Sequence, residues 1–337
     1  MTIQSKIPVW LDCDPGNDDV FAIILALFHP SFKLIGISTV HGNAPLSMTT
    51  HNTLALLDIV NVHNIKVYEG SQIPLVNPPK FAAEMHGHTG IGGATFPQVT
   101  YNQICQDMSY LEAMKQAIIK YEGNICLICT GTLTNVSKLI TAYPEIKSKI
   151  KYVSIMGGGI KLGNVTEFAE FNFHTDPHAA NHVIQELSSK IILSPLNLTH
   201  QVIATKQIRK RIYNARERTR NSSFREIFFG ILTFYSEAYA RKYGIIDGPP
   251  IHDPVAVYSL LPFNDENGEY GYKYLRRKIK VETEGDNEGE SIIENDSDDK
   301  EGVFIGQKLD VDKFWNEMLD ALDVAEKHSK LPSKRLY

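Results

Sequence analysis

Cysteine, tryptophan and long hydrophobic runs are scarce in this chain. Four cysteines among 337 residues are too few for the disulfide framework of a small secreted domain. No apolar run reaches the ~18 residues that a membrane-spanning helix needs, and no apolar segment follows a basic start as in a secretory signal. We therefore expect a cytoplasmic protein without a membrane partner, with the nucleus as the alternative compartment.

An excess of positive charge is missing as well. The formal net charge is −5, which argues against nucleic acid as a partner. One stretch, Lys206 to Arg220, is locally basic, and either a nucleic-acid surface or a solvated helix face would explain it. Few aromatic residues interrupt this stretch, so the solvated helix face is the favoured interpretation.

Cys126 and Cys129 form a Cys-x-x-Cys pattern, which can bind metal or form a redox disulfide. Both residues lie in the apolar run Ile125–Cys129, which is typical of a buried strand. Positions three apart in a strand face opposite ways. We therefore expect two core residues rather than a metal or redox site.

Apolar strand-like runs alternate with helix-like segments, and this pattern predicts a wound α/β fold. The hydrophobic content of 43% is ample for a core. We predict a single domain over residues 1–337, with a mainly parallel, mixed sheet and helices on both faces. The expected strands are Ile7–Leu11, Leu34–Val40, Ile65–Val67, Ile125–Cys129, Tyr152–Met156, Ile191–Leu193, Lys278–Val281 and Val303–Lys308. The expected helices are Val20–Phe28, Met48–Val60, Tyr110–Tyr121, Asn135–Ala142, His178–Leu187, Phe224–Tyr243 and Asp310–Lys327.

Two segments stand outside this alternation. Residues 69–109 are expected to be mostly loop, and the glycine-rich run from His86 to Gly93 within them is a candidate lid. Residues 281–302 carry ten acidic residues and one lysine. Mutual repulsion and little apolar content predict a mobile, unpacked acidic loop at 282–302.

The densest chemistry follows the first strand, at Leu11 to Asp19. Four carboxylates fall within eight residues there: Asp12, Asp14, Asp18 and Asp19. The amino end of a helix stabilises a negative charge by only about 0.3–1 kcal/mol, which is too little to hold several clustered carboxylates together. A hard cation such as Ca²⁺, bound by oxygen ligands, would hold them. A capped helix with surplus surface acids is the alternative.

Two related patterns do not fit. An EF-hand loop that starts at Asp12 would need glycine and glutamate where Asn17 and Ile23 stand. A phosphatase with an aspartate nucleophile would need a hydroxyl residue and a lysine for the phosphate, and no convincing pair is found.

The stretch from Asp12 to Asp19 resembles the amino-terminal signature of the inosine–uridine nucleoside N-ribohydrolases. Further blocks appear in that family's order and at compatible spacing from about residue 7 to about residue 325. These blocks are Gly42-Asn43, His86-Gly87, Thr130-Gly131, Met156-Gly157-Gly158-Gly159, Asn164, Ala169-Glu170-Phe171-Asn172, Asp176-Pro177, Leu198-Thr199-His200 and His252-Asp253-Pro254.

The resemblance implies a calcium site and a catalytic pair. Asp14, Asp19, Asp253 and the main-chain carbonyl of Thr130 would bind Ca²⁺, and Asp14 would also be the general base towards the attacking water. His252 has an ordinary pKa of ~6.5, which suits donation of a proton to the leaving base near neutrality. A helix cap is the structural alternative for Asp253, because Pro254 suits the first position of a helix.

The resemblance also assigns the substrate contacts. The expected ribose-binding residues are Asp18, Asn43, Asn164, Glu170 and Asn172, with a capping or turn role as the alternative for the last two. The expected remainder of the pocket is Met156, Phe171, the loop around His86, and Tyr235 and Tyr239, which share a helix face.

We therefore expect a Ca²⁺-dependent enzyme that hydrolyses the N-glycosidic bond of ribonucleosides, prefers uridine and forms a homo-oligomer, a dimer or a tetramer. The preference for uridine is what the resemblance implies: His252 directly before Asp253 resembles the branch of the family that includes pyrimidine-preferring and broad-specificity members. The branch that uses a tryptophan instead favours purines, and Trp10 and Trp315 both lie in expected core elements. A broad-specificity or purine-preferring hydrolase is one alternative. A calcium-dependent nucleoside-binding protein without turnover is the other.

Overall fold

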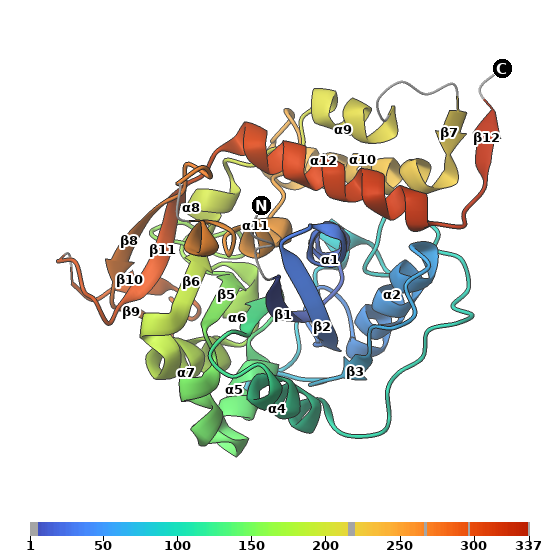
Figure 1. Ribbon diagram of the computed structural model, residues 1–337. Helices are drawn as coiled ribbons and strands as arrows, with labels where there is room; N and C mark the ends of the chain where they lie inside the picture. The colour runs from blue at the N-terminus through green and yellow to red at the C-terminus, as the bar shows by residue number, and fades with distance from the viewer. Residues whose placement is uncertain (1–5, 215–219, 266–267, 296, 336–337) are drawn as a thin grey trace.

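The computed structural model describes residues 6–214, 220–265, 268–295 and 297–335 (Figure 1). Its strands are β1 (Ile7–Cys13), β2 (Phe32–Thr39), β3 (Val67–Glu69), β4 (Cys126–Cys129), β5 (Tyr152–Met156), β6 (Ile191–Ser194), β7 (Arg220–Ser222), β8 (Lys273–Arg277), β9 (Ile279–Val281), β10 (Ser291–Ile293), β11 (Val303–Lys308) and β12 (Ser333–Arg335). Its α-helices are α1 (Asp19–Phe28), α2 (Leu46–Ile59), α3 (Ala83–His86), α4 (Tyr110–Lys120), α5 (Thr134–Ala142), α6 (Phe171–Thr175), α7 (Pro177–Leu187), α8 (Leu196–Thr199), α9 (Lys206–Tyr213), α10 (Ser223–Tyr243), α11 (Asp253–Tyr258) and α12 (Val311–His328).

One eight-stranded sheet forms the centre of the molecule, in the order β3-β2-β1-β4-β5-β6-β11-β8. All neighbours in this sheet run parallel except β11 and β8, which are antiparallel. The predicted mixed, mainly parallel sheet is therefore confirmed. Every residue of β1 is buried, as expected for a parallel strand whose two faces are both covered.

Helices cover both faces of the sheet (Figure 1). Helices α1, α2, α10, α11 and α12 contribute buried apolar side chains to one core, whereas α4, α5 and α7 contribute to the other. Cys126 belongs to the first core and Cys129 to the second. The prediction that these two cysteines are core residues on opposite faces is confirmed.

Both tryptophans are buried, Trp10 in the sheet and Trp315 in α12, as the sequence predicts. The apolar stripe of α12 is also confirmed, because Phe314, Met318 and Leu322 are buried on one side of that helix. Within the described residues, no helix has the length and apolar character to cross a membrane.

The long segment between β3 and α4 is mostly loop, as predicted, and contains only the short helix α3. Asp58 at the end of α2 anchors its far end. The Asp58 carboxylate accepts hydrogen bonds from the backbone N–H groups of Thr100, Tyr101 and Asn102, and from Nδ2 of Asn102.

The expectation that charge repulsion leaves residues 282–302 without packed structure is wrong around β10. This strand pairs antiparallel with β9, and Gly289 and Ser291 are buried. The acidic side chains of Glu284 and Asp286 remain exposed at the turn, so the charges stay solvated while uncharged positions pack inwards. The mobility of this segment stays a prediction.

The basic stretch is partly described. Helix α9 is mainly exposed on its charged positions, in line with the favoured solvated helix face. Arg216 and Arg218 lie outside the described residues.

Candidate active site

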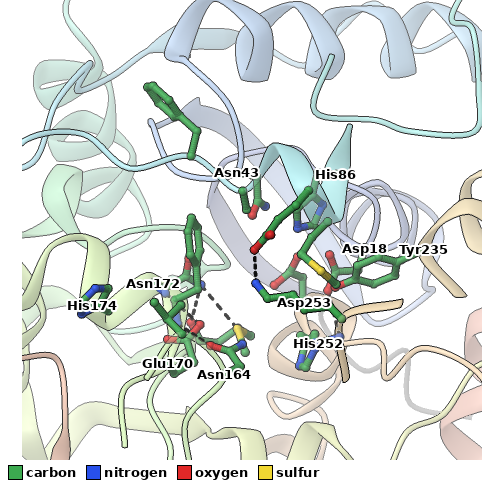
Figure 2. A pocket seen from close by; sticks show the side chains of 18 of the residues that line it. Asp18, Asn43, His86, Asn164, Glu170, Asn172, His174, Tyr235, His252 and Asp253 are labelled. Atoms are coloured by element: carbon green, nitrogen blue, oxygen red, sulfur yellow. Dashed lines mark hydrogen bonds and ion pairs between the residues drawn. The ribbon is translucent and has the colours of Figure 1, made fainter. Parts of the chain in front are cut away.

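A pocket lies where the strands β1, β2, β4 and β5 end at one edge of the sheet, and Figure 2 shows the side chains around it. This is the place where open α/β sheets bind ligands. Most of the predicted site residues line this pocket: Asp18, Asn43, His86, Thr130, Met156, Asn164, Glu170, Phe171, Asn172, Tyr235, Tyr239, His252 and Asp253. Asp14 and Asp19 are fully buried and bonded to pocket residues.

The turn between β1 and α1 and the start of α11 together bring three carboxylates into one cluster. Oxygens of Asp18, Asp19 and Asp253 lie within 4.8 Å of one another. Asp253, which is more than two hundred residues away in the sequence, joins them because it begins α11, and α11 packs against α1.

Neutral groups donate hydrogen bonds to Asp14, Asp18 and Asp19. Asp14 Oδ2 accepts from the backbone N–H of Asn43 at 2.7 Å. Asp19 accepts from Asn43 Nδ2 at 3.0 Å and from Thr130 Oγ1 at 2.8 Å. Asp18 accepts from the backbone N–H of His252 at 3.1 Å.

Burial and mutual repulsion dominate the electrostatics. Burial raises the pKa of Asp14 well above its usual range, and the nearby Asp19 carboxylate raises it further. Burial and Asp19 raise the pKa of Asp18 to about 7. The pKa of Asp253 is raised by burial and then by Asp18, Asp19 and Asp14. These acids therefore lack a compensating positive charge among the protein groups around them.

The donor set fits a hard cation. Among the described residues, Oδ1 of Asp14 is buried without a hydrogen-bond partner, which leaves one lone-pair site directed at no protein donor. The other oxygens belong to carboxylates and to the carbonyl of Thr130, which accepts from Asn172 Nδ2 at 2.8 Å. Ca²⁺ prefers such all-oxygen sets. Asp18, which is predicted to bind ribose, lies within the same cluster.

Asp12 lies outside this cluster, although it is the first acid of the motif. Its carboxylate accepts from the Ser38 hydroxyl and from Asn135 Nδ2 inside the sheet. Strand β1 ends at Cys13, so Asp14 lies in the turn that follows. Its side chain therefore points in a different direction from that of Asp12.

His252 is buried between two hydroxyl groups. Its Nδ1 lies 2.8 Å from Thr199 Oγ1 and its Nε2 lies 2.6 Å from the Tyr239 hydroxyl. Burial lowers the pKa of His252 well below its ordinary value, and His200 and His86 lower it further. The expectation of an ordinary histidine pKa is therefore wrong, because the ring is desolvated and has histidine neighbours.

His86 lies against Tyr235 at a ring-centroid distance of 5.4 Å. Its Nδ1 accepts from the backbone N–H of Asn17 at 2.9 Å. Burial lowers the pKa of His86 to about 3, so the ring is neutral near pH 7. Because Nδ1 is an acceptor, the ring proton is on Nε2, and His86 is a hydrogen-bond donor at its free nitrogen.

Glu170 and Asn172 line the pocket (Figure 2), and their binding of ribose stays a prediction. The Glu170 carboxylate accepts hydrogen bonds from the backbone N–H groups of Gly158, Asn172 and Phe173. Glu170 therefore caps α6, which is the alternative role expected for it, and also lines the pocket. Burial raises the pKa of Glu170 to about 7. Asn164 Oδ1 accepts from the Phe171 N–H at 2.9 Å and fixes the turn before α6.

Sequence reasoning missed several lining residues, among them Lys80, His174, Lys242 and Tyr243. It also gave no role to Asn17, whose side chain bonds the Met85 carbonyl and the Gly92 N–H and so holds the His86 loop. A polar residue inside a cluster of acids at a buried turn is the only sequence signal for Asn17. Nothing in the local sequence indicates Lys80 or His174.

Comparison with known proteins agrees with this geometry. Residues 9–316 match the family described as inosine-uridine preferring nucleoside hydrolase. The chain is 41% identical to the uridine nucleosidase of Saccharomyces cerevisiae, over 98% of this chain and 100% of that protein. It is 32% identical to the pyrimidine-specific ribonucleoside hydrolase RihA of Escherichia coli, over 83% of this chain and 85% of that one.

The solved structures give the same result for the fold. The purine-preferring ribonucleoside hydrolase from Gardnerella vaginalis superimposes with a TM-score of 0.84 at 26% identity, and the match covers 95% of this chain and 99% of that one. The family match over residues 9–316, the relatives and the shared fold agree with a pocket built from buried acids at the ends of parallel strands. The chain belongs to the inosine–uridine preferring nucleoside hydrolase family and is a ribonucleoside N-ribohydrolase.

Proposed function

We propose that this enzyme hydrolyses uridine in preference to other ribonucleosides, with Ca²⁺ held by Asp14, Asp19, Asp253 and the Thr130 carbonyl. The observation that carries the metal assignment is the buried, partnerless Oδ1 of Asp14 beside a cluster of carboxylates. Asp18 contributes negative charge to the same cluster. When bound, Ca²⁺ supplies positive charge that orients the ribose hydroxyls and favours ionisation of a water.

Asp14 is the proposed general base. Its carboxylate takes a proton from the attacking water while the water oxygen bonds to the anomeric carbon. The carbon–nitrogen bond breaks, and its electron pair leaves with the base. The ribose carries positive charge in the transition state, which the surrounding carboxylates stabilise.

Tyr239 and His252 are proposed to supply the proton that the leaving base needs. His252 is neutral in its buried position, so an imidazolium is not the source. If the Thr199 hydroxyl donates to Nδ1, the Nε2–H group of His252 donates to the Tyr239 oxygen. The Tyr239 hydroxyl is then free to donate its proton to the leaving base. The phenolate left behind is held by the Nε2–H of His252 and regains a proton from water once the products have left.

The preference for uridine rests on the donors at the base end. The free Nε2–H of His86 and the hydroxyls of Tyr235 and Tyr239 border this end of the pocket, and the carbonyl oxygens of a uracil ring can accept from them. Trp10 and Trp315 are both in the core. The relative with 41% identity is a uridine nucleosidase.

A kinetic comparison tests the proposal. The purified enzyme is assayed for release of ribose from uridine, cytidine, inosine and adenosine, with Ca²⁺ and with chelator. We expect the highest kcat/KM for uridine and loss of activity in chelator that Ca²⁺ restores. A tenfold advantage for inosine or adenosine, about 1.4 kcal/mol, would overturn the base preference. Full activity in chelator would overturn the metal assignment.

The homo-oligomer and the cytoplasmic location stay predictions. Sedimentation velocity at micromolar concentration tests the oligomeric state, and we expect a dimer or a tetramer. A monomer at that concentration would contradict it.

A further inference from the structure

The acidic hairpin, defined as residues 279–293, lies behind the segment that carries the ribose-facing residues. Isolated β-bridges join Ser291 to Ile160 and Glu290 to Ala169. These bridges fall on either side of Asn164 and directly before Glu170. The hairpin therefore holds both ends of the loop that leads to Glu170.

The packing between these segments is close. Gly289 is buried with φ of +90°, and a Cβ there would lie 2.7 Å from Cα of His174. A Cβ at Gly158 would lie 2.5 Å from Ser291 Oγ. Such distances leave no room for a side chain, so the hairpin lies directly against α6 and the glycine turn after β5.

Glu288 makes two contacts from this hairpin, one to His174 in the wall of the pocket and one to Asn77 in the loop before Lys80. Its main-chain carbonyl lies 3.0 Å from Nδ1 of His174, and its Oε1 accepts from Asn77 Nδ2 at 2.7 Å. Lys80 Nζ donates to Nε2 of His174 at 2.9 Å. Because lysine can only donate, Nδ1 of His174 carries the proton and donates to the Glu288 carbonyl.

His174 and Lys80 line the pocket, and Figure 2 places His174 on the side of Glu170 and Asn172 that is remote from His252. One acidic residue outside the pocket thus joins two segments that are far apart in the sequence, the loop at Asn77 to Lys80 and helix α6. Neither segment has a strand of the central sheet at this point.

We propose that Glu288 is a positioning residue for substrate binding. Through Asn77 and His174 it fixes the wall against which Asn164, Glu170 and Asn172 bind the ribose. The inference rests on the ribose-binding role proposed for those three residues. The acidic hairpin thereby has a function in substrate binding, which its acidic composition does not suggest.

Four variants test this role. Glu288→Ala and Asn77→Ala each remove the bond between the two side chains, whereas Glu288→Gln keeps an amide oxygen that can accept from Asn77 and loses only the charge. Glu284→Ala removes an exposed charge from the same hairpin and is the matched control. KM, kcat and Tm are measured for each variant with the best ribonucleoside substrate.

We expect Glu288→Ala and Asn77→Ala each to raise KM about five- to tenfold with kcat within about threefold, since a lost ground-state contact changes KM first. Glu288→Gln and Glu284→Ala should stay close to the wild type. The double variant Glu288→Ala/Asn77→Ala should be no worse than either single one, because both remove the same bond. A purely structural role would lower Tm and leave KM unchanged.

The positioning role is overturned if KM is unchanged in Glu288→Ala, or if Glu288→Gln is impaired as severely as Glu288→Ala. Should Glu288→Ala not fold, Asn77→Ala decides, because it removes the same bond from the other side. The variant Asn172→Ala separates a failure of the positioning role of Glu288 from a failure of the ribose-binding assignment. If Asn172→Ala raises KM and the Glu288 variants do not, only the positioning role fails. If Asn172→Ala leaves KM unchanged, the ribose assignment itself fails.

Discussion

At the scale of single residues, position beside the carboxylate cluster distinguishes the two buried acids Asp12 and Asp14. Asp12 and Asp14 are two positions apart and both fully buried. One oxygen of Asp12 has two donors, Ser38 and Asn135, within the sheet. Asp14 bonds the Asn43 N–H through Oδ2, and Asn43 also bonds Asp19 of the carboxylate cluster. Oδ1 has no partner in either residue, but of the two acids Asp14 is the one that lies beside the cluster.

Exchanging each carboxylate for an amide tests this distinction. Asp14→Asn should lower kcat about 10²- to 10⁴-fold, the usual contribution of a general base. In EGTA its Tm should stay close to that of the wild type, because the amide oxygen can still accept from Asn43. Asp12→Asn is the matched control and should keep turnover within about threefold. Near-normal turnover in folded Asp14→Asn would contradict the assignment of the base.

The hydroxyl of Tyr239 has a separate test. Tyr239→Phe should slow uridine cleavage about 10²-fold if this hydroxyl delivers the proton. An activated aryl riboside, whose phenolate leaves without protonation, should be cleaved at nearly the wild-type rate by the same variant. Equal losses on both substrates would show that the hydroxyl has another function, such as holding the pocket in shape.

At the scale of elements, the sequence predicts structure formed by neighbouring residues and misses contacts between segments that are far apart in the chain. The turn from β1 into α1 is predicted well because Pro15, Gly16 and the acids lie within nine residues. The position of Asp253 beside them comes only from family resemblance, since it depends on how α11 packs against α1. The antiparallel edge strand β8 and the pairing of β10 are missed. Both lie in charged sequence, where pairing with a neighbouring strand outweighs local preference.

The long loop after β3 gives an element-scale prediction. Burial raises the pKa of Asp58, but the hydrogen bonds from residues 100–102 outweigh it and the pKa is lowered. A lowered pKa means that the stabilisation is complete above the unfolded value of ~3.9 and is lost as pH falls through the folded value. Asp58→Ala should therefore reduce the free energy of unfolding at pH 7 by about 1–3 kcal/mol. Thermal unfolding at pH 7 and at acid pH measures this, and the difference from the wild type should shrink in acid. A difference that is independent of pH would rule out the charge as its cause.

At the scale of the whole molecule, the parallel sheet assembles the site. Four strands end at one edge, and each delivers residues to the pocket there: Asp14 and Asp18 after β1, Asn43 after β2, Thr130 after β4 and Met156 in β5. The same arrangement brings buried acids together inside the folded protein only. In the unfolded chain these carboxylates are solvated and far apart. Their burial and mutual repulsion therefore destabilise the folded state unless a cation balances the charges.

The repulsion between these buried carboxylates predicts how Ca²⁺ changes the stability of the folded protein. A cation that binds the folded state alone stabilises it by about 2.7 kcal/mol at one hundred times its dissociation constant, so Tm should rise on addition of CaCl₂ to protein treated with EGTA. Asp253→Asn removes one of the repelling charges. In EGTA its Tm should therefore equal or exceed that of the wild type, whereas its response to Ca²⁺ should be largely lost. Differential scanning calorimetry of both proteins, with and without Ca²⁺, measures the two effects together. A wild-type Tm that does not respond to Ca²⁺, or an unchanged response in Asp253→Asn, would mean that these carboxylates do not hold the cation.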